Sequence, residues 1–372
     1  MSEYYRSEIR SAQADGKGRQ SLLLRGLDLV MALLSVVVGC LMLLTYFVPY
    51  TATSGWLFPI LGLLAPATYV GVVMLMLYWI LRWRWGWAAP MMLLAAVGLC
   101  YLGLFLKPDL RKPPERDLPR GTISILTYNT RLFYGPDGSS SRDSLMEWVR
   151  QCRADIVCLQ EVSPASGEMR ERIDSVMAGY ASVPPDGSTS NVIYTRFRVL
   201  DWGSLAEGVK GASWADLLIG YDTVRVFNTH LRSTKITSDD DAFLSRRNFM
   251  ADTAREEKMR SIVRRFRDNS IARAEQADTV ARIIACTPCR HMVCGDFNDT
   301  PMSYVYRLMS RGLRDAFREA GRGYSYTYRG FSNALRIDYV LVPEGYEVLS
   351  YEVPRIDYSD HYPVLVRIVR RP

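Results

Sequence analysis

Histidine is scarce in this sequence, and cysteine is never arranged as a metal site. The chain contains three histidines and seven cysteines. Its only close cysteine pair is Cys286 and Cys289. A structural zinc site needs four cysteine or histidine ligands, and one pair without a second pair or a matching pair of histidines does not supply them. The pair also lacks a thioredoxin-like context, so we expect either a disulfide or two ordinary thiols.

Charge is almost absent from residues 22 to 106, whereas the rest of the chain has a normal globular mixture. Three uncharged or nearly uncharged runs occur there, and each is close to the length of about 20 apolar residues that crosses a bilayer. We expect three transmembrane helices, at about 29–48, 57–81 and 88–106. A cleaved signal peptide would have one shorter apolar core, so the pattern predicts a retained membrane anchor.

Basic residues flank these runs unevenly. The tail of residues 1–28 carries five lysines and arginines, the second connection carries Arg82 and Arg84, and the first connection carries none. Because cytoplasmic loops are enriched in basic residues, we expect a multi-pass inner-membrane protein whose large C-terminal part is periplasmic. Five basic residues after the third run favour the opposite orientation, and these are Lys107, Arg111, Lys112, Arg116 and Arg120.

The chain lacks the charge of a polyanion-binding protein. Its formal net charge is +7, but residues after 110 contain only 38 Lys and Arg against 34 Asp and Glu. Such a small excess predicts no strong nucleic-acid affinity. The proline-rich segment 107–120 is typical of an extended linker, and we expect a folded domain over 121–372.

Short apolar, often β-branched runs recur through this domain, as in "TISILTYN", "DIVCLQEV", "VRVFNTHL" and "HMVCGDFN". Helical patterns lie between some of them, at 141–153 and over a charged segment from about 241 to 285 in which Asn269 marks a possible break. Runs of this kind suit strands buried on both faces. The sequence therefore predicts an α/β (α+β) domain with sheets covered by helices.

Polar side chains gather where these runs end. Side chains alternate along a strand, so Asp296 and Asn298 point the same way, as do Asn228 and His230. In "VCGDFNDTP", Gly295 lets the backbone pass close to the site, and Asp299 or Thr300 is the expected cap of a helix with Pro301 in its first turn. Carboxylates and amides without cysteine ligands favour Mg²⁺ or Mn²⁺, and such ions serve phosphoryl transfer.

Six motifs then occur in a diagnostic order, namely "TYNTR", "LQEV", "NTHL", "GDFNDTP", "RIDYVLV" and "SDHYPV". Together they resemble the endonuclease/exonuclease/phosphatase superfamily, which includes deoxyribonucleases, sphingomyelinases and inositol polyphosphate phosphatases. The resemblance covers residues 121 to 370 and implies a four-layered αββα sandwich of two β-sheets with outer helices. The three transmembrane helices precede it and lie outside the resemblance.

Site roles follow from the resemblance residue by residue. It implies Glu161 as the principal metal ligand, with Asn129 and Asp360 near the ion. Asp296 would position or deprotonate the attacking water, and Asn298 would hold that water or a phosphate oxygen. His361, oriented by Asp338, would stabilise the transition state, and His230 would contact phosphate or protonate the leaving oxygen. The expected substrate contacts are Asn129, Asn228 and Asn191. The general base, Asp296 or a histidine, stays open.

The expected function is a membrane-tethered, Mg²⁺-dependent phosphoesterase. Nucleic acid, a lipid or sphingolipid headgroup, and a soluble phosphomonoester remain as possible substrates. Histidine in "NTHL" disfavours an apurinic/apyrimidinic endonuclease, and no protein partner is expected. The alternative is a catalytically inactive membrane-bound binding or scaffold protein, but such decay should have removed a residue of the site and none is missing.

Overall fold

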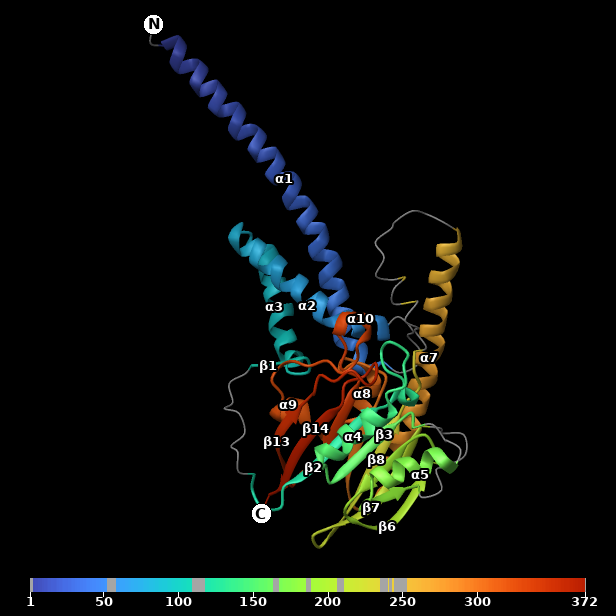
Figure 1. Cartoon of the computed structure of the whole chain (residues 1–372). Coiled ribbons are helices and arrows are strands. Elements are labelled where there is room, and N and C mark those ends of the chain that lie inside the picture. Colours follow the sequence, from blue (N-terminus) through green and yellow to red (C-terminus); the bar gives the residue numbers. More distant parts are fainter. Residues whose placement is uncertain are drawn as a thin grey trace. The chain divides into compact units, whose positions relative to one another are not determined.

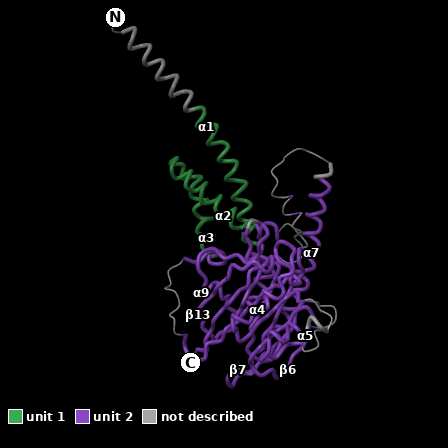
Figure 2. The backbone as a smooth tube through the Cα atoms, in the orientation of Figure 1, with its two compact units in different colours: residues 1–47, 64–100 green, residues 48–63, 101–372 purple. Residues whose placement is uncertain are grey.

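The computed structural model describes most of the chain in two compact units (Figures 1 and 2). The described residues are 3–51, 58–108, 118–162, 167–184, 189–205, 211–234, 240, 243 and 253–371. One unit comprises Met1–Phe47 and Leu64–Cys100, and the other comprises Val48–Leu63 and Tyr101–Pro372. Most of the expected linker, residues 109–117, and part of the charged segment before residue 253 lie outside the described residues.

Three apolar helices, long enough to cross a membrane, occupy the N-terminal region. They are α1 (Glu3–Phe47), α2 (Phe58–Leu81) and α3 (Trp85–Leu102), and the short η1 (Val48–Tyr50) follows α1. Many of their large apolar side chains are exposed, for example Leu33, Val37 and Leu93. Such surfaces fit a membrane anchor. The third run was expected to continue to residue 106, but the helix ends at Leu102, and Leu106 pairs with Tyr324 in a two-stranded β-ladder.

Polar groups join the helices of the first unit. Arg82 Nε and Nη2 each donate a hydrogen bond of 2.9 Å to the Asp28 carboxylate. The indole N–H of Trp79 donates to Ser35 Oγ at 2.8 Å. Pairing of this kind satisfies polar groups that lipid would leave unpaired.

Two six-stranded sheets form the C-terminal domain. The first sheet has the order β10-β12-β9-β8-β7-β6 and the second has the order β13-β14-β2-β3-β5-β4. Their main strands are β2 (Ile123–Asn129), β3 (Ile156–Gln160), β4 (Ala181–Val183), β5 (Val192–Thr195), β6 (Arg198–Ser204), β7 (Ala212–Ile219), β8 (Asp222–His230), β9 (Arg290–Asp296), β12 (Asp338–Val342), β13 (Tyr346–Glu352) and β14 (Val364–Arg370). The short β10 (Arg314–Asp315) closes one edge, and β1 (Leu106–Lys107) pairs separately with β11 (Gly323–Tyr324). Both sheets are mixed, because β2 runs parallel to β3 and β8 runs parallel to β9.

The two sheets enclose the main core, and helices cover their outer faces. Ile125 and Cys158 of the second sheet pack with Val226 and Cys294 of the first. The outer face of the second sheet packs against α4 (Arg142–Cys152) and α5 (Gly167–Val176). Outside the first sheet lie α7 (Thr253–Ala285) and α8 (Tyr304–Met309), and the short α9 (Ala316–Ala320) and α10 (Gly330–Asn333) follow in the chain. The expected four-layered sandwich is confirmed.

Gly295 in β9 is required by the close approach of two strands. Its φ is +131°, and a Cβ there would lie 1.9 Å from the carbonyl oxygen of Thr229 in β8. No side chain fits at that distance, so glycine allows β9 to run beside β8 immediately before Asp296.

Two local expectations were wrong. Helix α7 runs through Asn269 without a break, and the Asn269 side-chain amide donates to Arg265 O inside the helix at 2.8 Å. The helix after "GDFNDTP" begins later than expected, with Ser303 as its cap. Asp299 instead pairs with the buried Arg273 at 3.3 Å. Among the main strands, β4, β6, β7 and β13 were not among the expected runs.

Candidate active site

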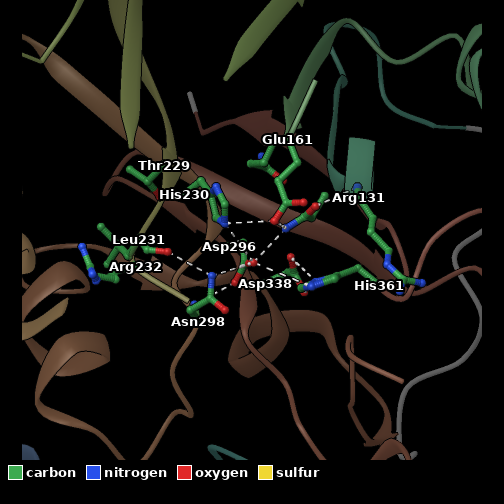
Figure 3. A network of polar contacts seen from close by, with 12 residues as sticks. Arg131, Glu161, Thr229, His230, Leu231, Arg232, Asp296, Asn298, Asp338 and His361 are labelled. Atoms are coloured by element: carbon green, nitrogen blue, oxygen red, sulfur yellow. Dashed lines mark hydrogen bonds and ion pairs between the residues drawn. The ribbon is translucent and has the colours of Figure 1, made fainter. Parts of the chain in front are cut away.

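Residues at the carboxyl ends of four strands, two from each sheet, form the site (Figure 3). Asn129 ends β2, Glu161 follows β3, His230 ends β8 and Asp296 ends β9. Within each sheet the two strands are parallel, so their carboxyl ends lie together, and the packing of the sheets brings the two pairs to one rim. Asp338 opens β12 directly opposite Asp296 in the ladder.

Asp296 is the buried centre of this arrangement. Its Oδ1 accepts the main-chain N–H of Asn298 at 2.7 Å, and its Oδ2 accepts the side-chain amides of Asn129 and Asn298, each at 3.0 Å. Burial, together with the negative charge of Asp338, raises the pKa of Asp296 to about 6, against the opposing effect of the two histidines. A carboxyl group with this pKa exchanges a proton near neutral pH, as a general base must.

His361 is bound to a carboxylate on one side and faces Asp296 on the other. Its Nδ1 lies 3.0 Å from Asp338 Oδ2, and its Nε2 lies 3.8 Å from Asp296 Oδ2. Burial alone would lower the pKa of His361, but Asp338 and Asp296 raise it to about 10. The imidazole is therefore protonated at neutral pH and is a hydrogen-bond donor rather than a base.

His230 and Glu161 form the opposite side. His230 Nε2 lies 3.4 Å from Glu161 Oε1 and 3.9 Å from Asp296 Oδ2, and it makes no hydrogen bond to the described residues. The Glu161 side chain is 30% exposed and accepts a hydrogen bond of 3.2 Å from the Asn129 amide. Figure 3 shows His230 and Glu161 directed toward Asp296. The Nε2 atom of His230 is buried, whereas the partly open carboxylate of Glu161 lines the pocket and is available to a ligand.

The donor set fits a hard divalent cation, because Glu161 and Asp360 both present carboxylate oxygens to the pocket. Asn129 was expected near the ion, and its side-chain amide makes hydrogen bonds within the site. Its amide nitrogen faces Glu161 and Asp296, and its oxygen accepts the Arg131 N–H at 3.0 Å.

A second possible ligand group consists of Asp296, Asp338 and His361, whose ligand atoms lie within 4.8 Å of one another. Both Asp338 oxygens, however, already contact His361 Nδ1, at 3.2 and 3.0 Å. A cation there would compete with the imidazolium for the same carboxylate. Asp360 on the Glu161 side is likewise paired, since its Oδ2 lies 3.4 Å from Arg131 Nε.

The sequence over residues 126–361 matches the model of the Endonuclease/Exonuclease/phosphatase family. The chain belongs to this family. The matched segment is more than half of the chain and contains every expected site residue. Members of this family are phosphoesterase hydrolases that generally depend on a divalent metal ion, and the chain is accordingly a hydrolase acting on phosphoric ester bonds.

Solved structures of the same family are similar to the chain. An endonuclease/exonuclease/phosphatase family protein from Bacteroides thetaiotaomicron is 18% identical, with 68% of this chain and 98% of that chain covered and a TM-score of 0.47. The mannosyl-6-phosphatase Bt3783 of the same organism is 18% identical, with 66% and 99% covered and a TM-score of 0.47. TDP2 from Caenorhabditis elegans is 19% identical, with 68% and 77% covered and a TM-score of 0.45. No curated protein sequence matches significantly. Likeness at these identities says nothing about the substrate.

Two expected substrate contacts of this phosphoesterase lie away from the pocket. The Asn228 amide donates to the carbonyl oxygens of Leu159 and Val192, at 2.9 and 3.0 Å, and accepts from Gln160 at 2.7 Å. Asn228 thus ties the two sheets together. Asn191 is also buried, and its amide group makes no hydrogen bond to the described residues. Neither residue lines the pocket, and Asn129, the third expected contact, does not line it either.

Arg131 is a site residue that the sequence reasoning missed. It lines the pocket, and its Nε lies 3.4 Å from Asp360 Oδ2. A guanidinium at this position can contact a phosphate oxygen. The signal was present in the sequence, since Arg131 ends the quoted motif "TYNTR", but a lone arginine after a strand is usually a surface residue.

Proposed function

We propose that this protein is a membrane-anchored, divalent-metal-dependent phosphoesterase whose general base is Asp296. The observation that carries the proposal is the buried Asp296 carboxyl, which has a pKa of about 6 and three hydrogen bonds from Asn129 and Asn298. Such a group is held in one orientation and titrates where the reaction runs. His361, with its much higher pKa, serves as the cationic donor instead.

The side chains divide the reaction between them. Asp296 takes a proton from the attacking water, and the water oxygen forms a bond to phosphorus. The His361 imidazolium, fixed by Asp338, stabilises the negative charge that develops on the phosphate. His230 delivers a proton to the leaving oxygen as the phosphorus–oxygen ester bond breaks. Glu161 and Asp360 are the carboxylates that would hold Mg²⁺ or Mn²⁺, which supplies positive charge to a phosphate oxygen when bound.

The three apolar helices support a membrane location. Their length and hydropathy suit an anchor, and the basic residues of the tail and of the second connection favour a cytoplasmic position for those segments. With three crossings the catalytic domain is then periplasmic, on the outer side of an inner membrane. Protease added to cells with a permeabilised outer membrane should digest the domain, whereas protection of the domain would reverse the orientation.

Activity can be tested with the full chain in detergent micelles. The panel contains DNA, RNA, sphingomyelin, inositol phosphates and p-nitrophenyl phosphodiesters, each with and without Mg²⁺. Asp296→Ala should lower turnover by about 10²- to 10⁴-fold. Asp143→Asn is the matched control, because Asp143 lies on the exposed face of α4 and its ion pairs with described residues are to Arg142 and Arg172. Equal turnover by Asp296→Ala and the wild type would overturn the proposed role.

A further inference from the structure

The pocket at the active site is lined by two chemically different sets of residues. It encloses a cavity of about 140 Å³. One set carries the phosphate chemistry already described, including Glu161, Asp296 and His361. The other set, which we call the apolar wall, consists of Pro59, Leu63, Phe266, Phe331, Leu335 and Ile337. A phosphate ester that carries a hydrocarbon chain can use both sets, since its phosphate suits the first and its chain suits the second.

Part of the apolar wall comes from the first turns of a helix that is long and apolar enough to span a membrane. Pro59 and Leu63 lie in α2, and this part of α2 belongs to the same compact unit as the catalytic domain. Phe266 comes from α7 and the other three residues come from the segment 331–337. The first turns of a candidate membrane span therefore contribute to the lining of the active-site pocket.

The α2 segment is packed closely against the loop that follows the catalytic motif. A Cβ on Gly62 would lie 2.4 Å from the carbonyl oxygen of Met302, so glycine permits main-chain contact there. The Tyr50 ring lies 3.9 Å from the guanidinium of Arg307 on α8. Met302 lies six residues after Asp296 in the chain. These contacts fix the start of the apolar helix against the catalytic side of the domain.

The geometry points to a phosphate ester of a membrane amphiphile as the substrate, with its phosphate at Asp296 and His361 and its hydrocarbon chain along the wall of Pro59, Leu63 and Phe266. This inference rests on the proposed phosphoesterase function. The cavity has room for the phosphate and the first carbons of the chain, and the remaining chain stays in the lipid. Hydrolysis forms the water oxygen–phosphorus bond and breaks one phosphorus–oxygen ester bond. Asp296 takes the proton of the water, and His230 protonates the oxygen of the leaving alcohol.

The cationic groups of the pocket argue against a nucleic-acid backbone. Both arginines of the described lining face carboxylates, since Arg131 lies 3.4 Å from Asp360 and the buried Arg273 lies 3.3 Å from Asp299. A polynucleotide needs a track of cations along its successive phosphates. The described lining of the pocket contains two arginines, both already facing carboxylates, and does not supply such a track.

Three p-nitrophenyl phosphodiesters test this inference with one leaving group and one readout. They carry ethyl, hexadecyl and thymidine 5′ groups, and the full chain is assayed in maltoside micelles with Mg²⁺. Leu63→Gln and Phe266→Ser each remove part of the apolar wall, from different elements. Leu64→Gln is the matched control, because Leu64 is the next residue of α2, is 45% exposed and does not line the pocket.

We expect the wild type to prefer the hexadecyl ester by at least about tenfold in kcat/KM, since hydrocarbon pockets discriminate by this much for small differences in chain contact. Leu63→Gln and Phe266→Ser should each lose about tenfold on that ester and keep the wild-type rate on the ethyl ester, while Leu64→Gln changes neither. The ethyl rate also reports whether each variant is folded. If one wall variant fails to fold, the other gives the answer.

The inference is overturned if the wall variants leave the hexadecyl-to-ethyl ratio unchanged, or if the thymidine ester is the best substrate. Partitioning of the hexadecyl ester into micelles would raise its rate equally in the wild type and in the wall variants. An effect of partitioning alone would therefore leave the hexadecyl-to-ethyl ratio unchanged by the substitutions, and the inference would be overturned. If the ethyl ester is hydrolysed through Asp296 without a chain-length effect, the phosphoesterase function stands and the lipid substrate falls. If the wild type hydrolyses none of the three esters, the proposed function itself falls.

Discussion

The Nδ1 atom of His361 lies 3.0 Å from Oδ2 and 3.2 Å from Oδ1 of Asp338, and both residues are buried. This pair fixes the orientation and the charge of the imidazole together. The other ring nitrogen of His361, Nε2, faces Asp296. The pair explains how one pocket keeps a cationic donor beside a carboxyl group that acts as a base.

Asp338→Asn should remove most of the charge that holds His361 protonated. The pKa of His361, now about 10, should fall, so the alkaline limit of kcat should move to lower pH. Turnover at neutral pH should fall by about 10²-fold. A pH profile of kcat for both proteins checks this, and an unchanged alkaline limit with lower kcat would show that the charge of His361 is set by other groups.

The same pair makes stability depend on pH. The folded pKa of His361 is raised above its ordinary value of 6.5. The stabilisation is therefore fully present below about pH 6.5 and is lost as the pH rises through about 10. Chemical denaturation of the metal-free protein between pH 6 and pH 10.5 should show a falling free energy of unfolding, and the fall should be smaller in Asp338→Asn. Equal slopes in the two proteins would refute the assignment.

Glu161→Gln should weaken the metal site without unfolding the domain, because the Glu161 side chain is 30% exposed and the amide has nearly the same shape. The Mg²⁺ concentration for half-maximal activity should rise by about 10- to 100-fold, since a neutral amide is a poorer ligand than a carboxylate. Isothermal titration with Mg²⁺ supplies a readout independent of activity. Mg²⁺ binding as tight as in the wild type would show that Glu161 is not a ligand of the ion.

Gly295→Ala should be among the most destabilising single changes in the domain. The added methyl group would lie 1.9 Å from the Thr229 carbonyl oxygen, so β9 has to separate from β8. Gly138→Ala is the matched control, because Gly138 also has a positive φ, +80°, but its Cβ would meet open space. Backbone strain alone costs about 1 kcal/mol, whereas the clash should cost more than about 3 kcal/mol. Equal melting temperatures for the two variants would contradict the close approach.

Asn228→Ala should act on stability rather than on substrate affinity. The three hydrogen bonds of the Asn228 amide connect the two sheets, and their loss leaves buried carbonyl groups unpaired. We expect a loss of about 2–4 kcal/mol in unfolding free energy and an unchanged KM in the protein that remains folded. A raised KM at wild-type stability would restore the substrate-contact role that the sequence suggested.

The sequence determined the main features of this protein through local signals. Uncharged runs of membrane-spanning length are visible without any structure, as are the short apolar runs of central strands. The polar residues at the ends of those runs, from Asn129 to His361, predicted a rim because strands of one sheet expose their ends together. Family membership followed from the order of the same motifs.

The strands with weak patterns needed the tertiary structure. Strand β6 is mostly exposed and β7 contains Asp216, so neither has the continuous apolar run that marks a buried strand. Their place is fixed by strand pairing, since β7 pairs with β8 and β6 pairs with β7. The helix cap at Ser303 was missed for a similar reason. Asp299 is of a residue type that often caps helices, but it pairs with the buried Arg273, which is distant in the chain, and Ser303 caps the helix instead.

Only the tertiary structure decided which polar residues face the substrate and what lies opposite them. Asn228 and His230 share a strand face in the sequence pattern, yet Asn228 is held between the sheets while His230 reaches Glu161. Pro59 and Leu63 belong to an apolar run that predicts nothing but a membrane span, and their position beside Asp296 depends on contacts between residues far apart in sequence. Such contacts arise from packing, which alternation and hydropathy along the chain do not encode.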